Sequence, residues 1–378
     1  MSTETLYLDH AATSPVRPDV AAAMAPFFAE RFGNPASAHT AGRAARTALE
    51  DARERVAELL DAAPRDIVFT GSGTEADNLA VLGRWRAAGG AVAVSAVEHS
   101  AVRRAAAAAA REGAAVTTVA VDEDGRVHAD AVEEALAEPH AVVSVMWANN
   151  EVGTLQPVGE IAALCRERGA VLHTDAVQAV GHVPVSVRET GVDLLSLSAH
   201  KFGGPRGVGA LYVREGVELE PLLYGGGQER GLRSGTPNVA GVVGLMTALE
   251  SAVAELEAER VRLGRLRDQL QDRVLAGVPE ARVNGGAADR LPHVLSVGLD
   301  GVGPDVLLPA LDLAGLAVSA GSACHSGASA PSHVLLAMGR EADAALRFSL
   351  GWSTTEEEAE RAARTFVEVV ERVRSAAG

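Results

Sequence analysis

The stretch DIVFTGSGTEADN, residues 66–78, combines a short β-branched run, a turn of small residues and the start of a helix. Residues 67–70 favour a buried strand, and the glycines at 71 and 73 interrupt it. Backbone amides at the start of the following helix, approached through glycines, favour an anion such as a phosphate group. The stretch therefore predicts a strand–turn–helix unit with a phosphate site, and the alternative is an ordinary strand-to-helix turn.

Strand and helix patterns alternate around this unit, from about residue 40 to residue 215. Alanine, valine and leucine recur at helical spacing in residues 44–59. The runs that favour strands are DIVFT (66–70), AVAVS (91–95), AAVTTVAV (114–121), AVVSVMW (141–147), AVLHTD (170–175), DLLSLS (193–198) and VGALYV (208–213). Strands that alternate with helices predict a mainly parallel sheet with helices on both faces.

The pattern changes near Asn238, where a Leu-rich, charged helical stretch through residues 254–275 predicts a connector leaving a first domain. Three later runs favour strands: HVLSVGL (293–299), GLAVSA (315–320) and ALRFSL (345–350). Residues 355–376 favour an amphipathic helix, with Ser353 and Thr354 as cap candidates. We expect an α/β fold with a large domain at 16–255 and a small α+β domain formed by 1–15 and 256–378.

Composition excludes several classes of protein. The chain has 378 residues, 34 Lys+Arg against 50 Asp+Glu, and a net charge of −16, which opposes direct binding of nucleic acid. Its two cysteines, Cys165 and Cys324, give neither a disulfide framework nor a metal-binding spacing. The amino terminus carries no apolar segment typical of export, and the densest apolar runs are shorter than the roughly 18 residues of a membrane span. We expect a cytoplasmic protein without a metal site.

A carboxylate and a lysine stand at the ends of two predicted strands. Asp175 ends AVLHTD, and Lys201 follows DLLSLS in SAHKFGG. Together with a phosphate turn, this pair matches pyridoxal phosphate, because the lysine can bond to the aldehyde and the acid can keep the pyridine nitrogen protonated. The rival interpretation is a dinucleotide-binding oxidoreductase, supported by GSGTEA and by Glu98 after the next strand.

Many ordered motifs extend this interpretation over nearly the whole chain. They are YLDHAATSP (7–15), FGNPAS, GSGTEADN, VEHSAV, NNEVGTLQPV, HTDAVQ, SAHKFGGPRGVGALYVR, GGGQERGLRSGTPN and SAGSACHSGASAPSHVL. The sequence resembles the cysteine desulfurase family, pyridoxal-phosphate enzymes of the class V aminotransferase type. The resemblance implies fold type I of these enzymes, a large α/β domain with a small domain built from both chain ends, in a homodimer.

The resemblance also implies a role for individual residues. Lys201 would bond to the cofactor, and His99 would stack over its ring and move protons. Asp175 and Gln178 would contact the pyridine nitrogen and the ring oxygen, while Asn150 and Arg347 would hold the substrate carboxylate. The residues implied to contact the cofactor phosphate are Gly73, Thr74, Ser198 and His200, with Thr236 reaching the phosphate of a neighbouring subunit.

Cys324 stands in a run of small residues, SAGSACHSGASA (319–330), which favours a loop. The resemblance implies that L-cysteine is converted to L-alanine, with its sulfur held on Cys324 as a persulfide and passed to an acceptor protein. The long form of this loop resembles the iron–sulfur-assembly and nitrogen-fixation branch. Ala320, His325 and Ala330 depart from that branch, so a cluster scaffold and a transfer-RNA thiolation enzyme both stay open as acceptors.

Three other functions are alternatives at this point. The first is another class V aminotransferase or lyase, such as a selenocysteine lyase, for which Cys324 would be incidental. The second is the dinucleotide-dependent oxidoreductase, and the third is an inactive sulfur-carrier or scaffold subunit. Cys165, on the apolar face of a helical pattern, is interpreted as a core residue.

Overall fold

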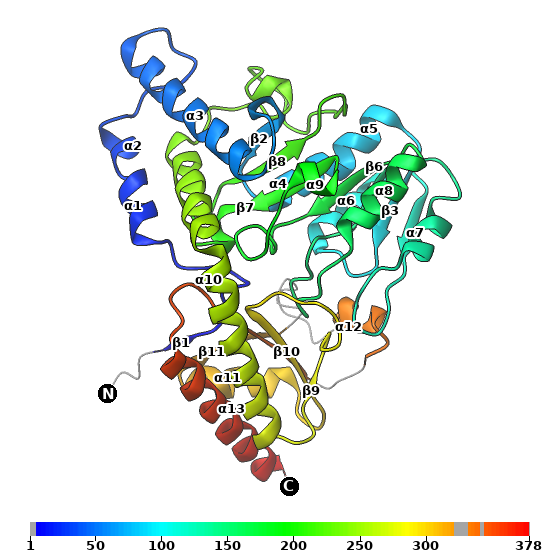
Figure 1. The fold of residues 1–378 in the computed structure, drawn as a ribbon, viewed down its shortest axis with the longest axis vertical. Coiled ribbons are helices and arrows are strands. Elements are labelled where there is room, and N and C mark those ends of the chain that lie inside the picture. Colours follow the sequence, from blue (N-terminus) through cyan, green and yellow to red (C-terminus); the bar gives the residue numbers. More distant parts are fainter. Residues whose placement is uncertain (1–4, 321–331, 341–343, 378) are drawn as a thin grey trace.

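The computed structural model describes residues 5–320, 332–340 and 344–377. The two largest hydrophobic cores occupy different halves of the molecule, and the long helix α10 (Val239–Gly277), which contributes to both cores, runs through both halves in Figure 1. The larger core draws on residues 11–253 with Leu291 and Val294, and the smaller core on residues 6–8 and 263–370. We retain the division into 16–255 and into 1–15 with 256–378 as our proposal for the domains; Ala11, Leu291 and Val294 of the second part join the larger core.

A seven-stranded sheet forms the centre of the upper half. Its strands, in spatial order, are β2 (Ile67–Thr70), β8 (Gly209–Val213), β7 (Leu194–Ser198), β6 (Val171–Asp175), β5 (His140–Ser144), β3 (Ala91–Ser95) and β4 (Val116–Val119). The strands from β7 to β4 are parallel, and β8 is antiparallel to both of its neighbours. The predicted fold class, with a mainly parallel mixed sheet, is confirmed.

Helices cover both faces of this sheet. They are α3 (Thr40–Leu59), α4 (Gly73–Asn78), α5 (Arg84–Ala88), α6 (Ser100–Arg111), α7 (Ala129–Ala135), α8 (Val158–Glu167) and α9 (Val187–Thr190), preceded by α1 (Pro18–Met24) and α2 (Pro26–Ala29). Phe69 and Leu195 belong to the large core, whereas their neighbours Val68 and Leu194 pack on the opposite face with α4. Successive strand residues are therefore buried on opposite sides, as a sheet covered on both faces requires.

The lower half contains a smaller sheet and the two ends of the chain. The sheet has the antiparallel order β12 (Ser319–Ala320), β13 (Ala344–Ser349), β10 (Val294–Leu299) and β9 (Arg282–Val283). A separate parallel pair joins β1 (Leu6–Tyr7) to β11 (Leu316–Ala317). The helices are α11 (Pro304–Leu313), α12 (His333–Ala337) and α13 (Glu356–Ala377). The first residues of the chain thus lie beside its last third (Figure 1).

Two local predictions differ from the structure. The run GLAVSA is divided at Val318, because β11 pairs with β1 whereas β12 pairs with β13. The cap of α13 is Thr355, whose Oγ1 accepts the amide of Glu358 while Glu358 accepts the amide of Thr355. The prediction of Ser353 or Thr354 as the cap is wrong by one residue, since Thr354 Oγ1 accepts the amide of Gly351.

The long helix α10 contains an apolar window long enough to cross a membrane. However, 56% of that window is buried inside the structure. The helix packs against α1, α3 and α13. These contacts explain its apolar composition as that of a core helix that joins the two halves.

Candidate active site

The amine of Lys201 lies against the amino-terminal segment of the chain. Lys201 ends the 3₁₀ turn (Ala199–Lys201) that follows β7. Its Nζ donates to the carbonyls of Ala11 at 2.7 Å and Ala12 at 3.0 Å. Its own carbonyl accepts a hydrogen bond from His182 Nε2 at 3.1 Å. The position of the lysine is therefore fixed both by the amino-terminal segment and by the turn that follows a central strand.

Gln178 and Asp175 lie next to this amine. Nε2 of Gln178 donates at 2.9 Å to the carbonyl of Ala11, the same oxygen that accepts from Lys201. Asp175 ends β6, is 5% exposed, and accepts the amide of Val177 at 2.9 Å. Among the described residues, Gln178 Oε1 is buried without a hydrogen-bond partner. The structure therefore brings together three of the residues predicted to form the site.

Two buried carboxylates and an imidazole form a compact polar cluster. One side-chain ligand atom from each of Asp77, His99 and Asp175 lies within 4.8 Å of the others. Burial raises the pKa of Asp175, although the nearby charges of His99 and Lys201 lower it. Burial, and then the charge of Asp175, raise the pKa of Asp77 well above its ordinary value. Two carboxylates in such a position need a shared proton or a cation between them.

A hydrogen-bonded chain lies behind this cluster. Oγ of Ser144 and Oγ of Ser196 lie 2.8 and 2.9 Å from the two ring nitrogens of His173. Burial lowers the pKa of His173 to about 3, so the ring is neutral near pH 7. Sequence reasoning missed both Asp77 and His173. The only signal for His173 was a polar residue inside an apolar strand, two positions before Asp175.

Glu98 is fully buried and joins the ends of two strands. Its Oε1 accepts hydrogen bonds from Ser95 Oγ at 2.7 Å and from the amide of Met146 at 2.6 Å. Burial, assisted by the charge of Asp175, raises the pKa of Glu98 from 4.5 to about 8. A carboxyl group enclosed in this way is not positioned to hold a ribose hydroxyl, which removes the main support for the dinucleotide interpretation.

Replacing Glu98 with glutamine should change the dependence of stability on pH. Glu98 is protonated in the folded protein and ionised in the unfolded chain between pH 4.5 and about 8. Its contribution to stability is fully present below pH 4.5 and is lost as the pH rises to about 8. The free energy of unfolding of Glu98→Gln, measured with denaturant across this range, should therefore fall less than that of the parent. An equal fall in the free energy of unfolding of both proteins would contradict the raised pKa of Glu98.

The glycine turn before α4 lies against the residues that follow β6 and against the end of β7. A β-carbon on Gly73 would lie 2.7 Å from Cγ2 of Val177 and 3.3 Å from Cβ of Ser198. Glycine therefore lets the helix begin close to the strand ends. Thr74, the next residue, is exposed. His200 is turned toward the amino-terminal segment, with Nδ1 3.1 Å from Thr13 Oγ1.

Arg347 is buried against the amino-terminal segment and the turn at Asn150. It lies on β13, is 3% exposed, and donates through Nη1 to the carbonyl of Asn150 and through Nη2 to Asp9, both at 2.8 Å. Its Nε is buried without a partner among the described residues. Asn149 stabilises a turn, because its Oδ1 accepts the amides of Glu151 and Val152. Asp9 was not predicted, since it is 338 residues from its partner.

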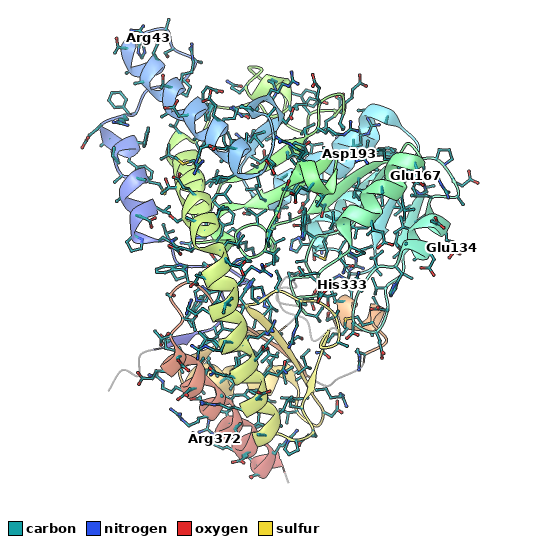
Figure 2. All side chains as sticks on the ribbon, in the orientation of Figure 1. Arg43, Glu134, Glu167, Asp193, His333 and Arg372 are labelled. Carbon is teal, nitrogen blue, oxygen red and sulfur yellow. The ribbon has the colours of Figure 1, made fainter. Side chains whose placement is uncertain are left out.

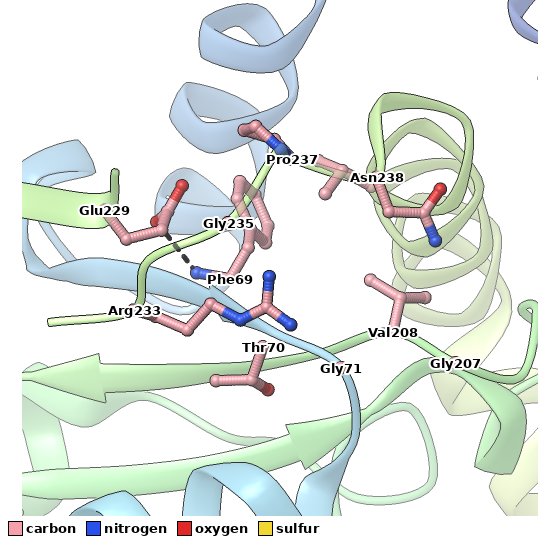
Figure 3. Close-up of a pocket in the computed structure, with 11 residues that line it drawn as sticks. Phe69, Thr70, Gly71, Gly207, Val208, Glu229, Arg233, Gly235, Pro237 and Asn238 are labelled. Atoms are coloured by element: carbon pink, nitrogen blue, oxygen red, sulfur yellow. Dashed lines mark hydrogen bonds between the residues drawn. The ribbon is translucent and has the colours of Figure 1, made fainter. Parts of the chain in front are cut away.

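The loop that carries Thr236 lies beside the glycine turn. Thr236 itself is exposed. Arg233 of the same loop pairs with Glu75, whose other oxygen accepts the amide of Gly71. Figure 3 shows Arg233 and Gly235 beside Thr70 and Gly71, around a small pocket. The loop is thus held close to the start of α4, with Thr236 facing outward.

The two cysteines have different positions in the chain. Cys165 is fully buried in the large core, and burial raises the pKa of its thiol to about 12. The thiol is therefore inert near neutral pH, in agreement with its predicted core role. Cys324 and His325 lie outside the described residues, as does most of the segment predicted to be a loop.

Comparisons with known proteins show the family of the chain. The model of the family "Aminotransferase class-V" matches residues 6–362. The chain is 43% identical over 376 residues to cysteine desulfurase IscS of Dictyoglomus turgidum, covering 98% of this chain and 95% of that protein. The structure of a NifS-like protein matches with a TM-score of 0.89 at 36% identity, over 97% of this chain and 99% of that one.

A further solved structure, SspA in complex with cysteine, matches with a TM-score of 0.79 at 32% identity. It covers 91% of this chain and 98% of that one. The family model, the curated relative and both structures thus extend over nearly the whole chain. The chain belongs to the aminotransferase class-V family and, within it, to the cysteine desulfurases.

Proposed function

We propose that this protein removes sulfur from L-cysteine, with pyridoxal 5′-phosphate as cofactor, and releases L-alanine. Enzymes of its family depend on this cofactor. The observation that carries the proposal is the convergence of Lys201, Gln178 and the buried Asp175 at the ends of neighbouring strands. A lysine, a ring-nitrogen partner and a nearby glycine turn are the groups that this cofactor requires.

The residues present fit the cofactor. Asp77 and Asp175 are two adjacent buried carboxylates, a combination that a protonated pyridine nitrogen would stabilise. Gln178 Oε1 and Asp77 Oδ1 are buried without a hydrogen-bond partner among the described residues, so both atoms could still accept a hydrogen bond. When bound, the cofactor supplies a ring that accepts electrons from the substrate carbon atoms.

The following residues would hold it. Asp175 would pair with the pyridine nitrogen, Gln178 would contact the ring oxygen, and His99 would stack on the ring. The phosphate would be held by Gly73, Thr74, Ser198 and His200, together with Thr236 of a second copy of the chain. The exposure of Thr236 is compatible with this contact across a homodimer.

The substrate would be oriented by Arg347 and Asn150. Arg347 offers a buried guanidinium whose Nε has no partner among the described residues, and a guanidinium fork suits a carboxylate. Lys201 would bond covalently to the cofactor until the amine of the substrate replaces it there, and its freed amine would then remove the α-proton of the substrate. His99, which belongs to the cluster with Asp77 and Asp175, would also move protons.

Cys324 would receive the sulfur. Its thiolate attacks the sulfur atom of the bound cysteine, a sulfur–sulfur bond forms, and the bond between sulfur and the β-carbon breaks. The electron pair of that bond stays with the β-carbon, which takes up a proton and leaves as L-alanine. One cysteine and one thiol thus give one alanine and one persulfide, without an added oxidant.

The amount of alanine formed per cysteine consumed tests this proposal. A desulfurase should give one alanine per cysteine, with sulfide released when a reductant is present. An aminotransferase would instead give a keto acid, and a selenocysteine lyase would form alanine from selenocysteine but not from cysteine. An inactive carrier subunit would form persulfide only when another enzyme supplies the sulfur. A keto acid product, or no product, would contradict the proposal.

We further propose a cytoplasmic homodimer that passes the persulfide sulfur to an acceptor protein. The acceptor would be an iron–sulfur cluster scaffold or a transfer-RNA thiolation enzyme. The acidic net charge of −16 favours a protein acceptor over direct contact with nucleic acid. Capture of the protein that takes labelled sulfur from the enzyme would identify it.

A further inference from the structure

The chain enters and leaves residues 321–331 on different halves of the molecule. Before them, β12 pairs with β13 in the small sheet, where Ser319 lies opposite Arg347. After them, α12 packs on the large half, because Val334, Leu335 and Met338 share a core with Val97, Met146 and Val152. Figure 2 shows His333 of α12 where the two halves meet. The segment that carries Cys324 therefore ends at a helix held by the large half.

A buried hydrogen bond fixes the first turn of α12. Ser332 Oγ donates to Glu151 Oε2 at 2.5 Å, and both residues are less than 8% exposed, at 7% and 4%. The same hydroxyl oxygen accepts the amides of Val334 and Leu335 at 3.1 and 3.3 Å. Ser332 thus caps the helix and links it to Glu151 at once.

A second hydrogen bond lies beside the first. His333 Nε2 donates to the carbonyl of Glu98 at 2.9 Å. Glu98 immediately precedes His99, and Glu151 immediately follows Asn150. The two chain positions that hold α12 are therefore neighbours of two residues proposed to contact the cofactor and the substrate.

The position of α12 depends on these contacts. The helix has five residues, which is too short to be stable by itself. Contacts with a carboxylate that is already buried are also costly to lose, since the carboxylate would keep its desolvation penalty. A displacement of about 1 Å in a reacting group is enough to slow a reaction by about a hundredfold.

We propose that Glu151 is a positioning residue, which acts through Ser332 to fix the distal end of the Cys324 segment relative to the substrate site. His333 and the carbonyl of Glu98 form the second point of attachment. This inference rests on the proposed function, because it concerns the transfer of sulfur to Cys324. The inference gives a role to Glu151, Ser332 and His333, which are not among the residues proposed to contact the cofactor or the substrate.

Two steps of a single turnover distinguish this role from a general loss of structure. The holoenzyme is mixed with L-cysteine, and the change in visible absorbance of the bound cofactor reports the chemistry at Lys201. The mass of the peptide containing Cys324 reports persulfide formation. In Glu151→Ala and Ser332→Ala, persulfide formation should slow by about tenfold or more, whereas the absorbance change should keep its rate.

Three further variants complete the experiment. Glu151→Gln and Ser332→Thr keep an acceptor and a hydroxyl group, so they should restore most of the rate of persulfide formation. Arg340→Ala removes the exposed pair with Glu123 at the other end of α12 and should match the parent. The double variant Glu151→Ala/Ser332→Ala should be no slower than either single variant, because both lose one shared contact.

Two results would overturn the inference. Persulfide formation at the parental rate in Glu151→Ala and Ser332→Ala would show that the contact has no positioning role. An equal loss in both steps, without recovery in Glu151→Gln and Ser332→Thr, would show a structural role only. If the parent itself forms alanine without persulfide on Cys324, the proposed function fails before any variant is compared.

Discussion

Replacing Lys201 with alanine should yield a protein that does not keep the visible absorbance of covalently bound pyridoxal 5′-phosphate after gel filtration. Alanine formation from cysteine should fall by at least about a thousandfold. The physical reason is that no other amine is available at this position: Lys201 is the only lysine among the 34 lysine and arginine residues of the chain. Absorbance spectra and alanine assays of the purified protein measure both effects.

Lys201→Arg is the matched control for this experiment. Arginine keeps a positive charge beside the carbonyls of Ala11 and Ala12, but its guanidinium does not form the covalent bond. It should therefore lose activity as completely as the alanine variant. Borohydride reduction of the parent should fix the cofactor on the peptide containing Lys201. Attachment elsewhere, or appreciable alanine formation by either variant, would show that this assignment is wrong.

Replacing Cys324 with alanine should separate cofactor chemistry from sulfur transfer. The variant should keep the cofactor absorbance and its change on addition of cysteine, because Lys201, Asp175 and Gln178 are unchanged. Sulfide release in the presence of a reductant should fall by at least about a hundredfold, since no thiolate is present to accept the sulfur. Sulfide assays and rapid-mixing spectra measure the two properties.

Cys165→Ala provides the control, because it removes the other thiol. Cys165 is buried in the large core with a pKa raised to about 12, so it should not take part in sulfur transfer. Its replacement should leave the rate of sulfide release close to that of the parent. Parental sulfide release by Cys324→Ala would remove the role proposed for the segment around this residue.

The parts of the molecule that could be predicted from sequence are those governed by local patterns. The central strands follow from short β-branched runs next to glycine-containing turns, as in β2 and β3. Asp175 and Lys201 could be identified because Asp175 ends one predicted strand and Lys201 stands three residues after another, and parallel strands bring their carboxyl ends to one edge. The structure places both there.

The parts that could not be predicted depend on contacts between distant segments. Arg347 was expected to bind a carboxylate, but its pairing with Asp9 joins opposite ends of the chain. Asp77 lies in a helix whose sequence does not show that Asp175 is adjacent. The run 315–320 changes partner at Val318, because two sheets compete for it. Local propensity carries no information about such choices.

The docking of α12 is a similar case. Its apolar residues Val334, Leu335 and Met338 predict only that one side of a short helix is buried. Contacts with Glu151 and Val152 place that side of α12 on the large half of the molecule. Glu151 and its partner Ser332 are 181 residues apart in the sequence. The structure was needed to find this contact.

The mass of the peptide containing Cys324, measured after one turnover of the holoenzyme with L-cysteine and without reductant, tests the central claim most directly. We predict that this peptide gains one sulfur atom, which a reductant removes, in step with the appearance of one L-alanine per active site. Alanine formed at that rate while the Cys324 peptide keeps its original mass would contradict the account.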